Sequence, residues 1–177
     1  TMVDFAKIEK KWQRRWYKEK IFDAKPEKKK KKYFMTVPYP YASGPLHIGH
    51  GRTYTVADVF VRYKKLTGHN VLFPIAWHVT GTPVLAVAQQ IKNKDRKALD
   101  QYKYYIGYHE SDKSKISKIL KSFEEPENVM NYFSKTMIND FKLAGYAMDF
   151  SRQFTTTDKD YNKFIEWQFN HLNDKNY

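Results

Sequence analysis

The 177-residue chain contains no cysteine. This absence excludes disulfide frameworks, zinc knuckles and catalysis by a thiolate, and it favours no redox compartment. The sequence also lacks any apolar run near the roughly 18 residues that a membrane-spanning helix requires. Its charged N-terminal region has no apolar core of a secretory signal. We therefore expect a cytoplasmic protein without a membrane partner.

Acidic residues are few compared with basic ones. The chain has 32 Lys and Arg against 19 Asp and Glu, a formal net charge of +13. Such a balance attracts polyanions, although by itself it does not separate nucleic acid from an acidic membrane surface. The 41% hydrophobic fraction, with 14 Tyr, 12 Phe and 4 Trp, is ample for the packed core of about one domain.

The N-terminal region, residues 1–32, predicts a helix followed by a linker. Asp4 can cap a helix whose apolar residues, Phe5, Ile8, Trp12 and Trp16, recur at spacings of three and four. Pro26 and the lysine run 28–32 then predict an exposed connection. The lysine run can contact phosphate, but a solvated connection is the simpler interpretation.

Residues 33–91 predict the beginning of a doubly wound α/β sheet. We expect a short buried strand at Tyr33–Val37 and a second short strand at Val71–Pro74. A helix over His47–Thr67 should cross between them, which would make the strands parallel. Gly68 fits the position after that helix. The residues expected to face inward on it are Val56, Val59, Phe60, Tyr63 and Leu66.

A second helix should begin with Thr82 as cap and Pro83 as first residue. Its inward face is expected to consist of Val84, Val87, Ala88 and Ile91.

The remaining residues predict helices around a variable insertion. Residues 92–125 are polar and weakly periodic, although Ile116, Ile119, Leu120 and Phe123 fit an amphipathic helix. A helix with Pro126 near its start carries Met130, Phe133, Met137 and Phe141 and ends near Gly145. Thr157 and Asp160 have capping-box spacing before a last helix. Two strands cannot complete such a sheet, so we expect an excised or truncated piece.

His47 and His50 are the residues that point to chemistry. At spacing i, i+3 they share one face in the first turn of a helix, where free N–H groups and the helix dipole favour an anion. Gly49 leaves space for a flat base, and Gly44 lets the preceding loop approach a ligand. The pattern favours a nucleotide cradle, but two such histidines can also be caps or surface residues. Zinc is a lesser alternative, because no third ligand is evident, and we assign no metal ligand.

The segment from Pro40 to His50, PYASGPLHIGH, resembles the HIGH signature of class I aminoacyl-tRNA synthetases. A second segment, Phe73 to Pro83, is similar to leucyl-tRNA synthetases of the archaeal and eukaryotic branch, and a third similar stretch covers residues 145–169. The likeness spans nearly the whole chain and is weakest between Lys92 and Lys113. It implies the first half of a Rossmann-type, HUP-like nucleotide-binding fold with an incomplete sheet.

The resemblance implies that ATP, with Mg²⁺, binds at Gly44, Pro45, Leu46, His47, Ile48, Gly49 and His50. The implied reaction joins leucine to ATP, releases pyrophosphate and then transfers the leucyl group to tRNA(Leu). His47 and His50 would donate hydrogen bonds to the reacting phosphates. Tyr39, Tyr41, His78 and Thr80 are expected near the amino acid. Valyl, isoleucyl and bacterial leucyl relatives usually carry an aspartate where His78 stands, which weakens a direct contact of His78 with the substrate ammonium.

The second signature of the family, KMSKS, has only a superficial counterpart at Lys115–Ile119, which we assign to the amphipathic helix instead. Residues 126–177 should continue the catalytic domain toward an editing domain, and the chain holds neither that domain, the anticodon-binding domain nor the other half of the active site. We expect no aminoacylation by these 177 residues alone.

Three other functions stay open from the sequence. Valyl- and isoleucyl-tRNA synthetases share much of the pattern. A small nucleotidyltransferase uses a similar histidine turn, but it does not account for residues 73–83. A basic RNA-binding module fits the charge and the aromatic content, although no motif of such a module is present.

Overall fold

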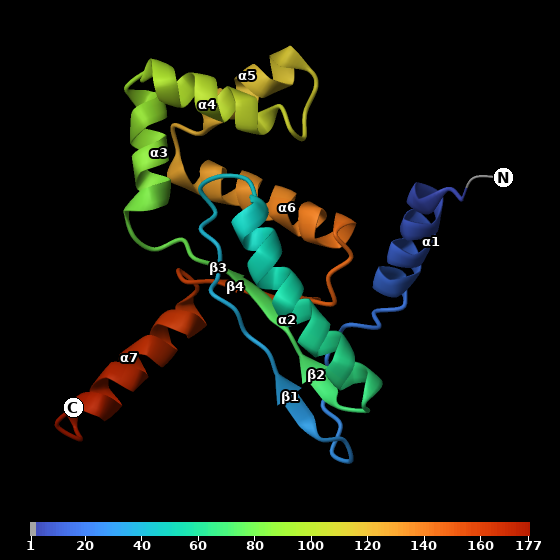
Figure 1. The fold of residues 1–177 in the computed structure, drawn as a ribbon. Coiled ribbons are helices and arrows are strands. Elements are labelled where there is room, and N and C mark those ends of the chain that lie inside the picture. The colour runs from blue at the N-terminus through green and yellow to red at the C-terminus, as the bar shows by residue number, and fades with distance from the viewer. Residues whose placement is uncertain (1–2) are drawn as a thin grey trace. The chain divides into compact units, whose positions relative to one another are not determined.

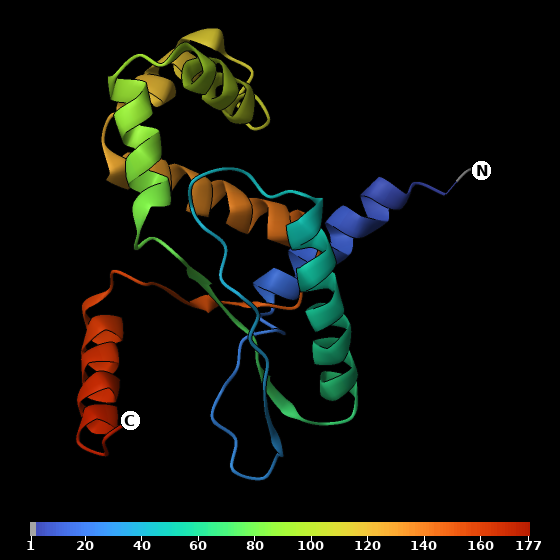
Figure 2. The same ribbon diagram turned by 60° about the vertical axis from the view of Figure 1, so that its left-hand side comes forward.

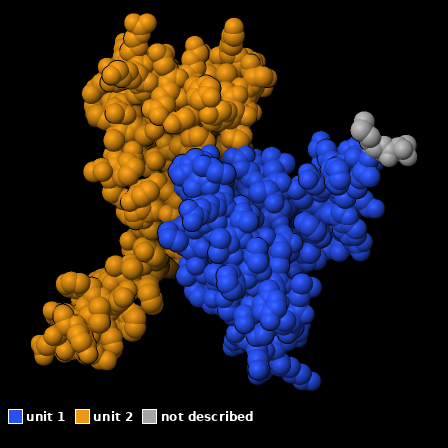
Figure 3. All heavy atoms as spheres, viewed as in Figure 1, with its two compact units in different colours: residues 1–38, 46–75, 137–153 blue, residues 39–45, 76–136, 154–177 orange. Residues whose placement is uncertain are grey.

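The computed structural model describes residues 3–177. These residues form two compact units, coloured separately in Figure 3. Unit 1 consists of residues up to 38, 46–75 and 137–153, and unit 2 consists of residues 39–45, 76–136 and 154–177. Within the described residues, no helix combines the length and the apolar character that crossing a membrane requires.

Unit 1 contains a parallel β–α–β element (Figure 1). Strand β1 (Lys32–Phe34) pairs with β2 (Asn70–Leu72) in parallel, with Tyr33 opposite Val71, and α2 (Ile48–Leu66) connects them. The predicted parallel pairing is therefore confirmed. The predicted length and burial of the first strand are wrong, since β1 has three residues and is largely exposed. Pro38 and Pro40 lack the N–H groups that a longer ladder needs.

Helix α2 has the predicted ends but a different buried face. His47 caps its start, Thr67 caps its end, and Gly68 follows with φ +83°. The buried residues are Tyr54, Ala57, Asp58 and Val61. The residues expected inward are exposed, from 52% for Phe60 to 87% for Leu66, and include Val56, Val59 and Tyr63. The face with Asp58 is buried because it forms hydrogen bonds with residues 145–147.

Helix α1 (Phe5–Lys18) also belongs to unit 1, and the Asp4 carboxylate caps it by accepting the Lys7 N–H at 2.9 Å. The predicted cap is confirmed. Only the C-terminal part of its apolar stripe packs, because Phe5, Ile8 and Trp12 remain at least 40% exposed. Trp16 and Tyr17 lie edge-on to the buried Phe22, at ring-centroid distances of 5.9 and 6.0 Å.

Strands β3 (Pro74–Trp77) and β4 (Asp149–Thr155) form a second pair, and both run from unit 1 into unit 2. The Asp149 N–H donates to the Phe73 carbonyl at 2.8 Å, and the Thr156 N–H donates to the Trp77 carbonyl at 3.1 Å. The described residues thus form two two-stranded sheets instead of one growing sheet. Strand β4 was not predicted, because its sequence DFSRQFT has no regular apolar alternation.

Unit 2 is mainly helical. Helices α3 (Thr82–Lys92), α4 (Arg96–Ile106) and α5 (Lys113–Ser122) precede α6 (Pro126–Leu143), which runs on into unit 1. Helices α4 and α5 lie side by side in both ribbon views (Figures 1 and 2). The weakly periodic segment therefore contains two helices. The predicted inward residues of α3 are all buried, as are Ile116 and Phe123.

Two predicted helix starts in unit 2 are wrong by one residue. Gly81, at φ +98°, is the N-cap of α3, so that Thr82 and Pro83 are its first two residues. Asp158 is the N-cap of α7 (Lys159–Asn173), and no capping box forms there. The Asp158 carboxylate instead accepts the backbone N–H of Thr155 at 3.0 Å and its hydroxyl at 2.7 Å.

Candidate functional site

The first turn of α2 is closed by its two histidines. His47 Nδ1 accepts the backbone N–H of Gly49 at 3.1 Å, and His50 Nδ1 accepts the backbone N–H of His47 at 3.2 Å. The two rings lie 4.0 Å apart between centroids. This reciprocal cap is a capping box built from imidazoles instead of the usual serine and glutamate. The two predicted residues are therefore brought together by local geometry.

The cap determines which nitrogen of each ring faces outward as a donor. Because Nδ1 accepts a backbone N–H in both rings, a neutral imidazole must carry its proton on Nε2. Burial, and then the neighbouring His47, hold the pKa of His50 below its ordinary value of 6.5. The neutral ring of His50 is thus favoured, and its Nε2–H is a hydrogen-bond donor at a helix N-terminus.

Gly49 is required by the histidine cap itself. A Cβ atom at this position would lie 2.8 Å from Cε1 and 3.0 Å from Nδ1 of His47. A side chain at this position would displace the His47 ring, which occupies the space where we expected a base. The role of Gly49 in the described structure is to let His47 fold back over the turn.

The predicted ATP-binding segment is divided between the two units. Gly44 and Pro45 belong to unit 2, whereas the residues from Leu46 to His50 belong to unit 1. In unit 1, His47, Ile48 and Gly49 are exposed to solvent. In unit 2, a Cβ atom on Gly44 would meet only Tyr105, at an ordinary 3.8 Å. The loop at Gly44 therefore tolerates a side chain in unit 2.

Two of the four residues expected near the amino acid lie together in unit 2. Tyr41 and His78 form an isolated parallel bridge, and their rings are 4.3 Å apart at 66°. The His78 N–H also donates to the Pro40 carbonyl at 3.0 Å. Tyr41 is 44% exposed, so this pair presents an aromatic and polar surface.

The other two residues are held by the end of β4. The ring of Tyr39 lies edge-on to Phe154 at 5.5 Å. The hydroxyl of Thr156 accepts the N–H of Val79 at 2.9 Å and that of Thr80 at 3.1 Å. Thr156 is buried and fixes the loop after β3. The only local sequence signal for Thr156 is its place in a run of three threonines.

Thr80 lines a cavity of about 380 Å³ in unit 2 that neither Tyr41 nor His78 reaches. Its wall is mostly apolar and includes Val84, Leu85 and Met130, together with Glu127. Between residues 3 and 177, no group of three His, Asp or Glu residues is arranged to hold a metal ion.

Cations gather at one cavity of unit 1. Lys25, Lys32 and Arg152 line a space of about 450 Å³, together with the aromatic residues Tyr33 and Phe34. Such a combination of cations and aromatic rings suits a phosphorylated or stacked ligand.

The protein-family model of the tRNA synthetases class I (I, L, M and V) matches residues 11–177. Curated relatives are leucine–tRNA ligases. The chain is 46% identical to that of Staphylothermus marinus over 168 residues, 47% identical to that of Thermoplasma acidophilum over 169 residues, and 45% identical to that of Pyrococcus horikoshii over 180 residues. The alignments cover 95%, 95% and 99% of this chain. The chain spans only 17–18% of the length of these relatives.

One solved structure has the same fold. It is the ternary complex of Agrobacterium radiobacter K84 agnB2 LeuRS with tRNA and LeuAMS, with a TM-score of 0.68 and 23% sequence identity. The match covers 99% of this chain and 18% of that one.

Proposed function

The chain belongs to the class I tRNA synthetases (I, L, M and V), and we propose that it supplies the ATP-binding turn of a leucine–tRNA ligase. In the proposed reaction, a carboxylate oxygen of leucine attacks the α-phosphate of ATP, pyrophosphate leaves, and leucyl-adenylate forms. A hydroxyl at the 3′ end of tRNA(Leu) then takes the leucyl group as an ester, and AMP leaves. The parallel β1–α2–β2 element, with the histidine turn opening the crossover helix, supports a Rossmann-type nucleotide site.

The reciprocal histidine cap is the observation that carries this proposal. The leucine carboxylate is ionised at neutral pH, so the attack needs no general base. It needs in-line positioning and donors for the charge that develops on the phosphate oxygens. His47 and His50 each have Nδ1 engaged with the backbone, which leaves Nε2–H as the donor. Their place at a helix N-terminus adds a favourable dipole.

Mg²⁺ is proposed to arrive with the polyphosphate. The described residues contain no group of three carboxylates or histidines that could hold the ion by themselves. Mg²⁺ commonly bridges substrate phosphates while keeping several waters. The histidine turn would then contact phosphate oxygens that the ion leaves free.

Leucine is the proposed amino acid because the relatives reported above are leucine–tRNA ligases. The contact between Tyr41 and His78 supports a recognition surface in unit 2. Tyr39 and Thr80 are their neighbours in the sequence, and each contacts a residue at the end of β4. His78 has no formal negative charge in either protonation state. We therefore propose that it orients the Tyr41 ring and does not pair with the substrate ammonium.

The tRNA partner is supported by charge. The chain carries a formal charge of +13, and the cavity with Lys25, Lys32 and Arg152 concentrates three cations beside two aromatic rings. Phosphate contacts of this kind weaken steeply with salt. The logarithm of the binding constant for tRNA is expected to fall linearly with the logarithm of the salt concentration.

ATP binding by the 177-residue chain tests the proposal. Calorimetric titration with ATP in the presence of Mg²⁺ should give measurable binding that weakens when His47 and His50 are both replaced by alanine. His171→Ala, which removes an exposed histidine of α7, is the matched control and should bind as the wild type does. Equal ATP affinity in all three proteins would show that His47 and His50 do not bind ATP. Tight RNA binding without any ATP binding would favour the RNA-binding module instead.

A further inference from the structure

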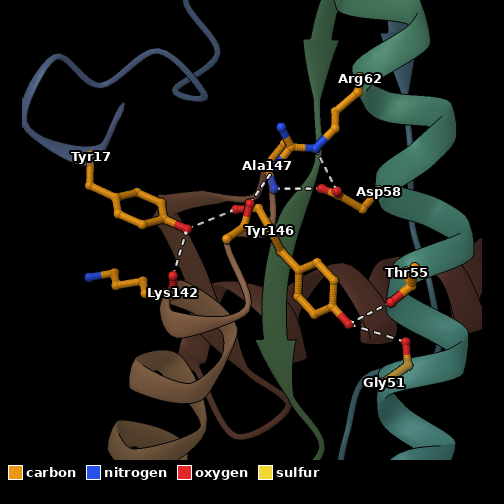
Figure 4. Close-up of polar contacts among 9 residues, drawn as sticks. Tyr17, Gly51, Thr55, Asp58, Arg62, Lys142, Tyr146 and Ala147 are labelled. Carbon is orange, nitrogen blue, oxygen red and sulfur yellow. Dashed lines mark hydrogen bonds and ion pairs between the residues drawn. The ribbon is translucent and has the colours of Figure 1, made fainter. Parts of the chain in front are cut away.

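The segment Gly145–Tyr146–Ala147 holds one face of α2 along three successive turns, as Figure 4 shows. Tyr146 bonds to the turn at Gly51, the Ala147 N–H to Asp58, and the Gly145 carbonyl to Arg62. Gly51, Asp58 and Arg62 share one side of the helix at spacings of seven and four. All of these residues belong to unit 1.

The hydroxyl of Tyr146 forms the contact nearest to the histidines. It donates to the Gly51 carbonyl at 3.1 Å and lies 2.8 Å from the Thr55 hydroxyl. A phenol has one proton to donate, so the Thr55 hydroxyl must be the donor in the second bond. The side chain of Tyr146 is 8% exposed, and its ring packs beside Phe141 at 5.8 Å. The hydroxyl is therefore held in place against the helix.

Gly51 connects this hydroxyl to the cap. It follows His50 directly in the chain, and its N–H donates to the His47 carbonyl at 3.1 Å. A displacement of the Gly51 peptide would move the His47 carbonyl and the His50 backbone together. The bond from Tyr146 thus restrains Gly51, which is joined to His50 through the chain and to His47 through a hydrogen bond.

The remaining contacts hold the segment 145–147 against the C-terminal half of α2. Asp58 accepts the Ala147 N–H at 2.6 Å and the Arg62 Nε–H at 2.6 Å. The Tyr17 hydroxyl donates to the Tyr146 carbonyl at 3.1 Å, on the side of the segment away from α2 (Figure 4). These bonds stabilise unit 1 without touching the histidine turn.

We propose that Tyr146 is a positioning residue for the histidine turn, and that its hydroxyl sets the orientation in which His47 and His50 present their Nε2–H groups to ATP. This role rests on the ATP function proposed above. Tyr146 itself does not contact the reacting atoms.

The test compares Tyr146→Phe with Tyr17→Phe in the 177-residue chain. Each change removes one hydroxyl from the same network and keeps the ring, so both should lower global stability by a similar amount. Amide hydrogen exchange separates local from global opening. In Tyr146→Phe the amides of His47 and Gly49 should exchange about threefold to tenfold faster relative to core amides such as that of Val61, the effect of losing one hydrogen bond. In Tyr17→Phe that ratio should stay unchanged.

Two substitutions of Thr55 test the same hydrogen-bond network. Thr55→Val removes the donor to the Tyr146 hydroxyl but leaves the bond to Gly51, so it should give a smaller increase in exchange at His47 and Gly49. Thr55→Ser keeps the hydroxyl and should behave as the wild type does. Unchanged exchange at both amides in Tyr146→Phe, or equal changes in Tyr146→Phe and Tyr17→Phe, would overturn the positioning role.

ATP titration of the same variants separates this inference from the proposed function. A weaker ATP affinity in Tyr146→Phe, with Tyr17→Phe unaffected, is the expected result. Wild-type chain that binds no ATP would refute the proposed function, whereas the exchange data would still decide whether Tyr146 orders the turn. Local loosening in Tyr146→Phe with unaltered ATP affinity would contradict the positioning role and leave the proposed function standing.

Discussion

The carboxylate of Asp149 accepts the backbone N–H of Ala24 at 2.8 Å, although 125 residues separate them. Its other oxygen accepts both the N–H and the hydroxyl of Ser151, at 3.0 and 2.5 Å. Asp149 is fully buried and begins β4, so the contact attaches the segment after α1 to the second strand pair. Altering a buried carboxylate that accepts three hydrogen bonds lowers the free energy of unfolding, because any loss leaves a buried donor without its acceptor.

Asp149→Asn should therefore destabilise the chain by about 1–3 kcal/mol. One of the two oxygens becomes an NH₂ group, so a donor must face either the Ala24 N–H or the Ser151 N–H. Urea denaturation followed by circular dichroism measures the effect. Asp160→Asn is the control, because Asp160 is an exposed carboxylate at the start of α7, and it should change stability by less than about 0.5 kcal/mol. Equal denaturation midpoints for the two variants would contradict the structural role of Asp149.

His50→Ala should lower the rate of adenylate formation by about 10²–10³, as removal of one transition-state donor does in other enzymes. The measurement is leucine-dependent pyrophosphate exchange in a protein that contains this segment and has the length of the relatives. Isoleucine and valine replace leucine in parallel assays, and exchange should be fastest with leucine. Near-normal exchange by His50→Ala would exclude His50 as a donor, and faster exchange with valine or isoleucine would change the amino acid assigned.

What could be predicted from the sequence depended on how local the determining contacts were. His47 and His50 were found because an i, i+3 pair at a helix start meets in any such helix. The ends of α2 followed from His47 and Gly68 for the same reason. For Gly49 the structure adds a local reason for the missing side chain, since a Cβ there would meet the ring of His47, two residues away.

The buried face of α2 could not be predicted because a distant segment selects it. The stripe from Val56 to Leu66 is more hydrophobic than the face with Ala57 and Asp58, and hydrophobicity alone favours its burial. The hydrogen bonds from residues 145–147 reverse that choice. The hydrogen bond between Ala24 and Asp149 could not be predicted for the same reason, because neither residue carries a local sequence signal for the other.

The stability of the histidine turn should depend on pH below neutrality. The pKa of His50 is lowered from 6.5, first by burial and then by His47. As pH falls through 6.5, the unfolded chain takes up this proton before the folded chain does. The stability from this group is thus present above 6.5 and is lost as pH falls through the lower pKa of the folded state. Protonation also blocks the Nδ1 atom that accepts the His47 N–H.

Titration of the His50 Cε1–H resonance by NMR measures this pKa directly. It should lie below 6.5 in the wild type. In His47→Asn it should rise but remain below 6.5, because the burial that is the larger cause persists and asparagine still caps the helix. A His50 pKa above 6.5 in the wild type would contradict the buried, neutral ring.

The exposed apolar stripe of α2 should make the 177-residue chain self-associate. Val56, Val59, Phe60 and Tyr63 are each more than half exposed and lie together at spacings of three and four, and contiguous apolar surface of this kind favours association. Phe60→Glu should reduce concentration-dependent association measured by sedimentation velocity. Gln90→Glu adds the same charge at an exposed position of α3 and should have no comparable effect. Equal reduction by both variants would assign the change to net charge instead of the stripe.

Two glycines in the same helical turn give a matched test of the cap. Gly49→Ala places a Cβ 2.8 Å from the His47 ring, whereas a Cβ at Gly51 meets only Ile48 at 4.0 Å. Gly51→Ala should therefore be neutral or stabilise the chain by up to about 1 kcal/mol, because alanine is a better helix former than glycine. Gly49→Ala receives the same helical gain but must displace His47 from its bond to the Gly49 N–H.

Thermal denaturation and ATP titration of the two variants distinguish these effects. Gly51→Ala should melt at or above the wild-type temperature and keep its ATP affinity. Gly49→Ala should lose ATP affinity, and NMR should show that His47 Nδ1 no longer accepts a hydrogen bond. If Gly49→Ala bound ATP as the wild type does while His47 was displaced, then His47 would serve only as a helix cap. His50 would in that case be the remaining histidine donor.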